Sequence, residues 1–198
     1  MTKKGDKTRA KILDEAARVF NRKGLGATSV NDILKASGTT KGNLYFHFSG
    51  KEEIGFEVLK REKHAFMNFL DEVLNEGGPE QGLNNFFKAA LEKHRQQDFV
   101  GGCIFGNTAL EASDTSPDFA AFVASVFDDW IMKIAVKIDQ TQQSGQMRQD
   151  IPARDLAEMI VATVEGGIMQ TRLMKSDKPL KHSMEALQKI LELRPGKG

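Results

Sequence analysis

Five polar or amphipathic side chains stand close together early in the chain, and their chemistry suits contacts with DNA; they are Thr40, Lys41, Asn43, Tyr45 and His47. An Asn amide can pair with adenine through two hydrogen bonds, and a Lys ammonium can donate to guanine. Leu44 and Phe48, four residues apart in the same stretch, provide a packing side at helical spacing. Gly42 costs a short helix about 1 kcal/mol relative to Ala, and its bare backbone would allow a close approach to DNA.

Two short helices with a glycine break between them are predicted to position these side chains. Ser29 is a predicted N-cap with an acid, Asp32, three residues later. The helix that it opens, over 28–37, ends at Gly38, and Thr40 is the N-cap signal for a second helix over 40–46. These lengths and this break indicate a helix-turn-helix, in which the second helix lies in the major groove.

Longer helices are predicted on both sides of this motif. An apolar stripe runs from Ile12 to Phe20 in a helix over 8–23, and the segment before it is expected to be a flexible basic arm. Ser49-Gly50-Lys51-Glu52 is predicted to form a capping box for a helix that continues to about Leu74. Helical periodicity then predicts helices over 80–97, 100–113, 117–144, 153–175 and 180–193. The predicted fold class is all-α with about nine helices.

The charge distribution divides the chain. Residues 1–51 hold eleven Lys or Arg against four Asp or Glu, a net charge of +7, and the remaining residues hold 17 against 23, a net charge of −6. A basic segment on an acidic body is expected where one end meets a polyanion, although charge alone fits a solvated basic face equally well. We therefore expect a DNA-binding domain over 1–51 and a second domain over 52–198.

Enzyme, metal and membrane classes lack support. One cysteine and four scattered histidines offer no metal-ligand spacing and no disulfide framework. The chain holds no nucleophile elbow, phosphate loop or glycine-rich dinucleotide turn, and no apolar run of the length that a membrane span needs. We expect no enzymatic activity, no cofactor and no metal. The charged N-terminus lacks the apolar core of a secretory signal, which predicts a cytoplasmic protein.

The motif residues resemble a known family. The segments TSVNDI (28–33) and ASGTTKGNLYFHFSGKEE (36–53), with Ile12-Leu13, Ala16, Phe20 and Gly24 upstream, resemble the TetR family of bacterial regulators. This resemblance covers about residues 8–55. Beyond it, the chain is similar to the family in length and helical character, and in a Gly145, Arg148 and Asp150-Ile151 loop before the penultimate helix.

The resemblance implies DNA-contacting roles for nine residues, namely Thr28, Ser29, Thr40, Lys41, Gly42, Asn43, Tyr45, His47 and Lys51. Thr28 and Ser29 would offer donors to a phosphate at a helix N-terminus. Tyr45, His47 and Lys51 would hold the DNA backbone, while Lys41, Gly42 and Asn43 would face base edges with Thr40 as cap or contact. Phe46 stands where the family often has tyrosine or tryptophan, and we assign it no polar contact.

The resemblance also implies a body that senses a ligand and dimerises. Small and apolar residues of the last two predicted helices would pair across a two-fold axis: Leu156, Met159, Ile160, Thr163, Gly166, Gly167, Gln170, Met184, Leu187 and Leu191. Aromatic stripes are usually core, but thirteen Phe against a single Tyr would suit an apolar pocket. Its predicted lining is Phe66, Phe69, Phe87, Cys103, Phe105, Asn107, Glu111, Phe122, Phe127 and Trp130.

The expected function is that of a ligand-responsive transcriptional regulator. It would act as a repressor, bind a palindromic operator as a homodimer and be released by a small apolar or aromatic effector. Two alternatives remain open at this point. One is a constitutive DNA-binding and dimerisation protein without a ligand. The other is a sensor of electrophiles or oxidants whose reactive group is Cys103. The simpler interpretation of Cys103 is a buried thiol that only packs against its neighbours.

Overall fold

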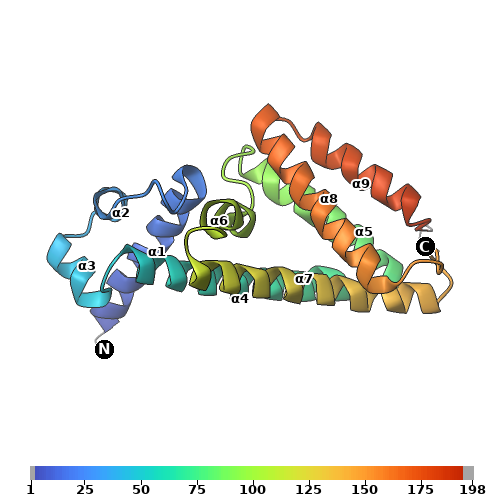
Figure 1. Ribbon diagram of the computed structural model, residues 1–198, viewed down its shortest axis with the longest axis horizontal. Coiled ribbons are helices and arrows are strands. Elements are labelled where there is room, and N and C mark those ends of the chain that lie inside the picture. The colour runs from blue at the N-terminus through green and yellow to red at the C-terminus, as the bar shows by residue number, and fades with distance from the viewer. Residues whose placement is uncertain (1–2, 194–198) are drawn as a thin grey trace. The chain divides into compact units, whose positions relative to one another are not determined.

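The chain folds into α-helices joined by short turns. The computed structural model describes residues 3–193, with side chains from residue 5 onward, and within that range it holds nine helices and no strand. The helices are α1 (Lys3–Lys23), α2 (Val30–Ser37), α3 (Lys41–His47), α4 (Lys51–Asn75), α5 (Pro79–Gln96), α6 (Ile104–Ala112), α7 (Pro117–Gln143), α8 (Ala153–Met174) and α9 (Lys178–Ile190) (Figure 1). This confirms the all-α prediction.

Two predicted helix starts and one predicted capping partner need correction. Helix α1 begins at Lys3, so the expected flexible arm is helical from that residue. Helix α6 begins at Ile104 and not at residue 100, because Gly101 and Gly102 have φ of 88° and 75°, which a right-handed helix excludes. At the start of α4, Ser49 donates to the Glu53 carboxylate from its amide (2.6 Å) and its hydroxyl (2.7 Å), so the partner is not Glu52.

The helices pack into two compact units. Unit 1 takes in the described residues up to His64 together with Ile104–Val123, and thus α1, α2, α3, α6 and the first parts of α4 and α7. Unit 2 takes in Ala65–Cys103 and the described residues from Ala124 onward. Helix α4 starts at residue 51 and continues without a break. These packing units therefore do not follow the division at residue 51, which stays a prediction about function.

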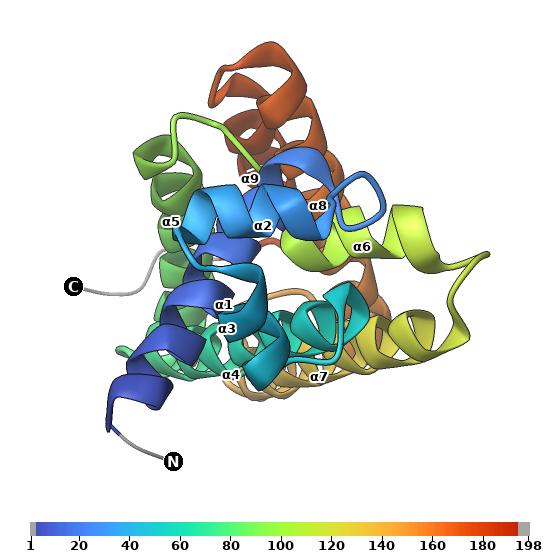
Figure 2. The ribbon, with the colours of Figure 1, turned by 90° about the vertical axis from the view of Figure 1, so that its left-hand side faces the viewer.

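Unit 1 is built around an apolar centre supplied mainly by α1 and by the two short helices. Its buried residues are Ile12, Leu13, Ala16, Phe20, Ile33, Leu44, Phe48, Ile54 and Val58. Figure 2 looks onto α2 and α3, the two helices of the predicted helix-turn-helix. Gly38 joins them with a left-handed φ of 62°, a conformation that favours glycine.

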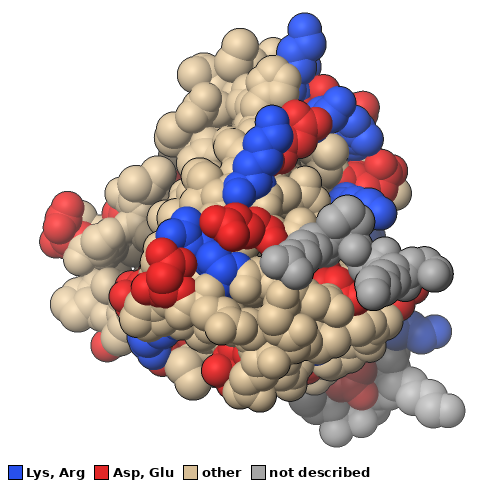
Figure 3. Space-filling model, turned by 90° about the vertical axis from the view of Figure 1, so that its right-hand side faces the viewer, with Lys and Arg blue, Asp and Glu red and all other residues tan. Residues whose placement is uncertain are grey.

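Unit 2 is a helical bundle in which α9 runs back along α8 (Figure 1). Its core holds Leu70, Leu83, Phe86, Phe87, Trp130, Ile134, Ile138, Leu156, Ile160, Leu180, Met184 and Leu187, among others. On the face drawn in Figure 3, Lys and Arg alternate with Asp and Glu and do not form an area of one sign. Among the described residues, no helix has the length and apolarity needed to cross a membrane.

Candidate functional site

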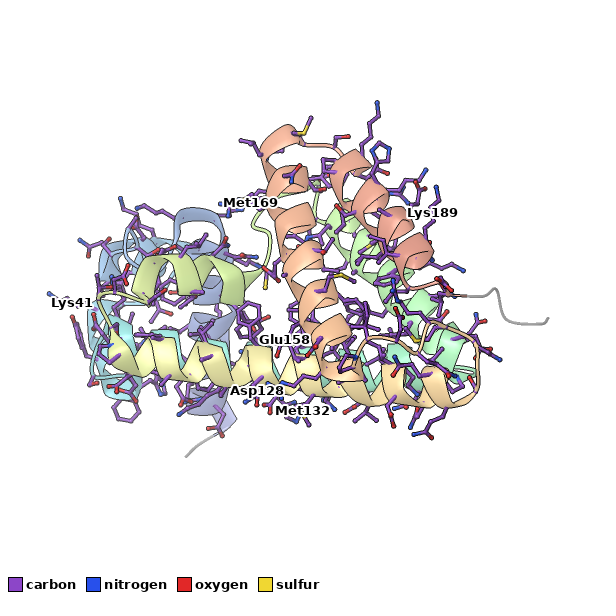
Figure 4. All side chains as sticks on the ribbon, turned by 45° about the vertical axis from the view of Figure 1, so that its right-hand side comes forward. Lys41, Asp128, Met132, Glu158, Met169 and Lys189 are labelled. Atoms are coloured by element: carbon purple, nitrogen blue, oxygen red, sulfur yellow. The ribbon has the colours of Figure 1, made fainter. Side chains whose placement is uncertain are left out.

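Helix α3 is anchored on one side and open on the other. Leu44 (0% exposed) and Phe48 (2%) attach it to the core of unit 1. Thr40 caps it by accepting from the Asn43 amide at 3.3 Å, which confirms the predicted N-cap. The predicted DNA contacts Thr40, Lys41, Gly42, Asn43 and Tyr45 are all exposed. The Lys41 ammonium lies 5.9 Å from the centre of the Tyr45 ring, and Figure 4 shows Lys41 pointing away from the ribbon.

His47 is half-buried at the end of α3. Its ring lies edge-on to the Phe46 ring, with centroids 5.0 Å apart, and tilted against the Phe48 ring at 6.3 Å. The Nδ1 atom is buried without a hydrogen-bond partner. A contact between His47 and a phosphate would therefore have to use Nε2.

The N-terminus of α2 differs from its predicted role. Thr28 is 2% exposed, its hydroxyl donates to the Gly24 carbonyl at 2.5 Å and its amide donates to Leu25 at 3.4 Å. Thr28 thus has no donor left for a phosphate, and we correct that assignment: it stabilises the turn. Ser29 is exposed, and it forms the predicted capping box with Asp32 through a 2.8 Å bond from its amide and a 3.2 Å bond to its hydroxyl.

A carboxylate also occupies this helix end. Lys23 donates to Asp32 at 2.8 Å, and together with the Ser29 donors it holds the pKa of the Asp32 carboxyl well below its ordinary value. The negative charge interacts favourably with the helix N-terminus, and it lies where a phosphate was expected next to Ser29.

Lys51 has partners that the sequence did not reveal. Its ammonium donates to the Leu25 carbonyl at 2.9 Å and to the Gly26 carbonyl at 3.2 Å. From α6, the Glu111 carboxylate accepts from the Gly26 amide at 2.8 Å. The turn between α1 and α2 is therefore held by one cation and one anion. An ammonium has three protons, so Lys51 keeps one for a phosphate.

The ten predicted pocket residues divide between the two units. Asn107 and Glu111 line a cavity of about 10 Å³ in unit 1, together with Phe20, Leu25, Gly55, Leu59, Ile104 and Thr108. Phe105 and Phe122 also belong to unit 1, and Phe122 lies edge-on to Phe56. A volume of this size admits about one water molecule. Asn107 and Glu111 therefore line no space in which an effector would fit, and Glu111 holds the α1–α2 turn instead.

The other six predicted pocket residues lie in unit 2: Phe66, Phe69, Phe87, Cys103, Phe127 and Trp130. Trp130 is 3% exposed, and three Phe rings surround it with centroid distances of 5.0 Å to Phe66, 6.1 Å to Phe86 and 6.0 Å to Phe127. Its indole Nε1 has no hydrogen-bond partner. A buried donor without a partner needs an explanation, such as a bound water or ligand.

Glu165, on α8, is a polar group of unit 2 that sequence reasoning missed. Burial raises the pKa of its carboxyl to about 7, and a hydrogen bond with Cys103 partly offsets that rise. Its Oε1 atom is buried without a partner. The available signal was an acid within the apolar stripe of residues 153–175.

The predicted dimer residues also fall into two groups. Six are buried inside the single chain, and we correct their assignment: Leu156, Ile160, Gly167, Met184, Leu187 and Leu191. A Cβ on Gly167 would lie 2.8 Å from Leu180, which shows how closely α8 packs on α9. Met159, Thr163, Gly166 and Gln170 are at least partly exposed. They lie among further exposed residues of α8, namely Ala162, Met169 (58%) and Leu173 (80%).

Comparisons with known proteins agree with this arrangement. The profile described as bacterial regulatory proteins, tetR family, matches residues 12–58, and a tetracyclin repressor-like C-terminal domain profile matches residues 79–187. The chain is 31% identical over 185 residues to the uncharacterized HTH-type transcriptional regulator YxaF of Bacillus subtilis, covering 91% of this chain and 92% of that protein. It is 27% identical over 174 residues to the HTH-type transcriptional repressor DhaR of a Mycobacterium species, covering 87% and 86%.

Solved structures give the same result. A TetR transcriptional regulator of Chloroflexus aurantiacus superimposes with a TM-score of 0.88 at 28% identity, covering 98% of each chain. The regulatory protein TetR of Rhodobacter sphaeroides superimposes with a TM-score of 0.87 at 25% identity, covering 91% of this chain and 96% of that one. The chain belongs to the TetR family of bacterial transcriptional regulators, whose members bind DNA operators, dimerise and are not enzymes.

Proposed function

We propose that this protein is a repressor that binds a palindromic operator as a homodimer and releases it when a small apolar or aromatic effector binds. The observation that carries the DNA-binding part is α3, a capped helix whose Leu44 is buried while Lys41, Asn43 and Tyr45 are exposed. An operator is chromosomal DNA, so the protein acts in the bacterial cytoplasm.

Contacts with DNA are assigned by exposure and chemistry. Lys41 and Asn43 face base edges, and Gly42 lets the backbone approach because a Cβ at that position would meet no atom within 4 Å. Tyr45, Nε2 of His47 and the third proton of Lys51 contact phosphates, which position the helix without reading sequence. Ser29 keeps a lesser role, since its hydroxyl already caps α2.

Dimerisation is assigned to the outward face of α8. Met159, Ala162, Gly166, Met169 and Leu173 recur every three or four residues, which places them on one side of the helix. Gly166 has open space around its Cα, so a second helix can approach it closely. Pairing of two such faces across a two-fold axis gives half-sites one helical turn of DNA apart or more.

The effector is assigned to unit 2 because that unit contains both buried aromatic rings and two buried polar atoms without a hydrogen-bond partner. Phe66, Phe86 and Phe127 offer ring faces and edges to an aromatic molecule. The Trp130 Nε1 would donate to an acceptor on the effector, and the Glu165 Oε1 would accept from a donor.

A purified full-length protein and a random duplex library test this proposal. Selection should recover an inverted repeat, and a compound in an aromatic amine, amide and phenol library should lower the affinity for it. Recovery of no preferred sequence would contradict operator binding. Affinity that no compound changes would favour the constitutive alternative.

The Cys103 alternative needs a reactive thiolate. In the structure the Cys103 side chain is instead hydrogen-bonded to the Glu165 carboxyl. A Cys103→Ser variant distinguishes the two: an unchanged response to the effector supports the proposed pocket, and a lost response to electrophiles supports the thiol sensor.

A further inference from the structure

Phe46 has an unusual position for an apolar side chain. It is 79% exposed, more than the neighbouring Tyr45 at 46%, although the same helix buries Leu44 in the apolar core of unit 1. An aromatic ring that faces water in the free protein has apolar surface available for a partner. The roles assigned so far to α3 use polar groups and leave this ring without a function.

The helix geometry points Phe46 directly away from the protein. Successive residues turn by about 100°, so Gly42 and Phe46 both lie on the side of α3 opposite the fully buried Leu44. A Cβ on Gly42 would meet no atom within 4 Å, so that side of the helix is open. Phe46 is thus the outermost side chain of the face that the proposed function directs toward DNA.

The ring is also held in place. It lies edge-on to the His47 ring at 5.0 Å and 82°, and His47 is itself half-buried. An α-helix with its side chains is about 10–12 Å across, which matches the roughly 12 Å width of the major groove. Helix α3 can therefore enter the groove, and the face opposite Leu44, which carries Phe46, then lies toward the base edges.

Base edges in the major groove offer one apolar group. They present hydrogen-bond donors and acceptors, which a phenyl ring cannot satisfy, and the C5-methyl of thymine, which it can cover. We propose that Phe46 is a specificity-determining residue that contacts a thymine methyl in each operator half-site. Asn43 is three residues before Phe46, so the two side chains are neighbours on the surface of the helix. The thymine contacted by Phe46 should therefore lie within about two base pairs of an adenine contacted by Asn43. The inference rests on the proposed operator binding.

Deoxyuridine tests the contact because it differs from thymidine only by the missing methyl group. Operator duplexes obtained by selection with the full-length protein are prepared with each thymine of both half-sites replaced in turn by deoxyuridine. Their affinities for wild type, Phe46→Ala and Asn43→Ala are measured by fluorescence anisotropy at one salt concentration. We expect one thymine position at which replacement weakens wild-type binding about fourfold per half-site, the effect of one buried methyl group.

The pattern across the variants decides the outcome. At that position, Phe46→Ala should bind both duplexes equally, while Asn43→Ala should keep the methyl effect. A methyl effect that persists in Phe46→Ala, or no sensitive thymine at all, overturns the inference. So does uniform weakening by Phe46→Ala, which indicates a sugar contact. If the wild type selects no operator, both the proposed function and this contact are overturned. A persisting methyl effect, the lack of a sensitive thymine or uniform weakening overturns the Phe46 contact alone and leaves operator binding intact. An unchanged thermal midpoint for Phe46→Ala shows that the exposed ring was not needed for folding.

Discussion

Replacement of Lys51 by alanine should damage both folding and DNA binding, because its ammonium serves two partners. In the free protein it donates to the carbonyls of Leu25 and Gly26 at 2.9 and 3.2 Å. Hydrogen bonds from a charged group contribute about 1.5–3 kcal/mol when fully buried. The Lys51 side chain is partly exposed, so solvent screening lowers the joint contribution to about 1–2 kcal/mol.

Two assays separate the two roles. For a chain of this length, about 1 kcal/mol shifts the thermal midpoint by about 2–4 °C, so Lys51→Ala should lower it by about 2–8 °C. A phosphate contact in each protomer should also reduce the steepness of the plot of log affinity against log salt by about 2 for the dimer.

Lys41→Ala is the matched control, since Lys41 is exposed and its one described contact is the Tyr45 ring. It should weaken operator binding and leave the midpoint almost unchanged. An unchanged midpoint for Lys51→Ala would refute the role in holding the turn. An unchanged salt dependence would refute the phosphate contact.

Three further predictions concern unit 2. Burial raises the pKa of the Glu165 carboxyl from 4.5 to about 7. Between these two pH values the folded state therefore binds more protons than the unfolded state. The free energy of unfolding should fall as pH rises through this window, by at most about 3 kcal/mol. Urea unfolding at pH 5 and pH 8 should show a smaller loss for Glu165→Gln, and equal losses would contradict the assignment. Gly167→Ala should cost about 1–3 kcal/mol in thermal unfolding, because its Cβ would meet α9 at 2.8 Å. Gly166→Ala meets nothing within 4 Å in its own chain, so it should cause no such clash inside the chain and should instead weaken the dimer in sedimentation, since Gly166 lies on the face proposed for dimerisation. Met169→Glu, on the outward face of α8, should shift sedimentation toward monomer without destabilising that monomer, and an intact dimer would place the interface elsewhere.

The sequence was sufficient for features whose partners lie within a few residues of each other. The Ser29–Asp32 capping box, the end of the helix at Gly38 and the Thr40 cap were all predicted from adjacent residues, and the structure contains them. Together with apolar spacing they predicted the helix-turn-helix and most helix boundaries. The Ser49 cap was assigned to the wrong acid because Glu52 and Glu53 are both within reach of that helix start.

Only the tertiary structure decided which way each face points. Leu156 and Leu187 have the same apolar pattern whether they meet their own core or a second chain, and packing of α8 on α9 buries them within one chain. The same holds for polar groups whose partners are distant in sequence. Lys51 reaches carbonyls about 25 residues earlier, and Glu111 reaches an amide 85 residues away. Local capping depends on backbone geometry over one turn, which the sequence encodes directly, whereas burial depends on how distant helices pack, which no short pattern contains.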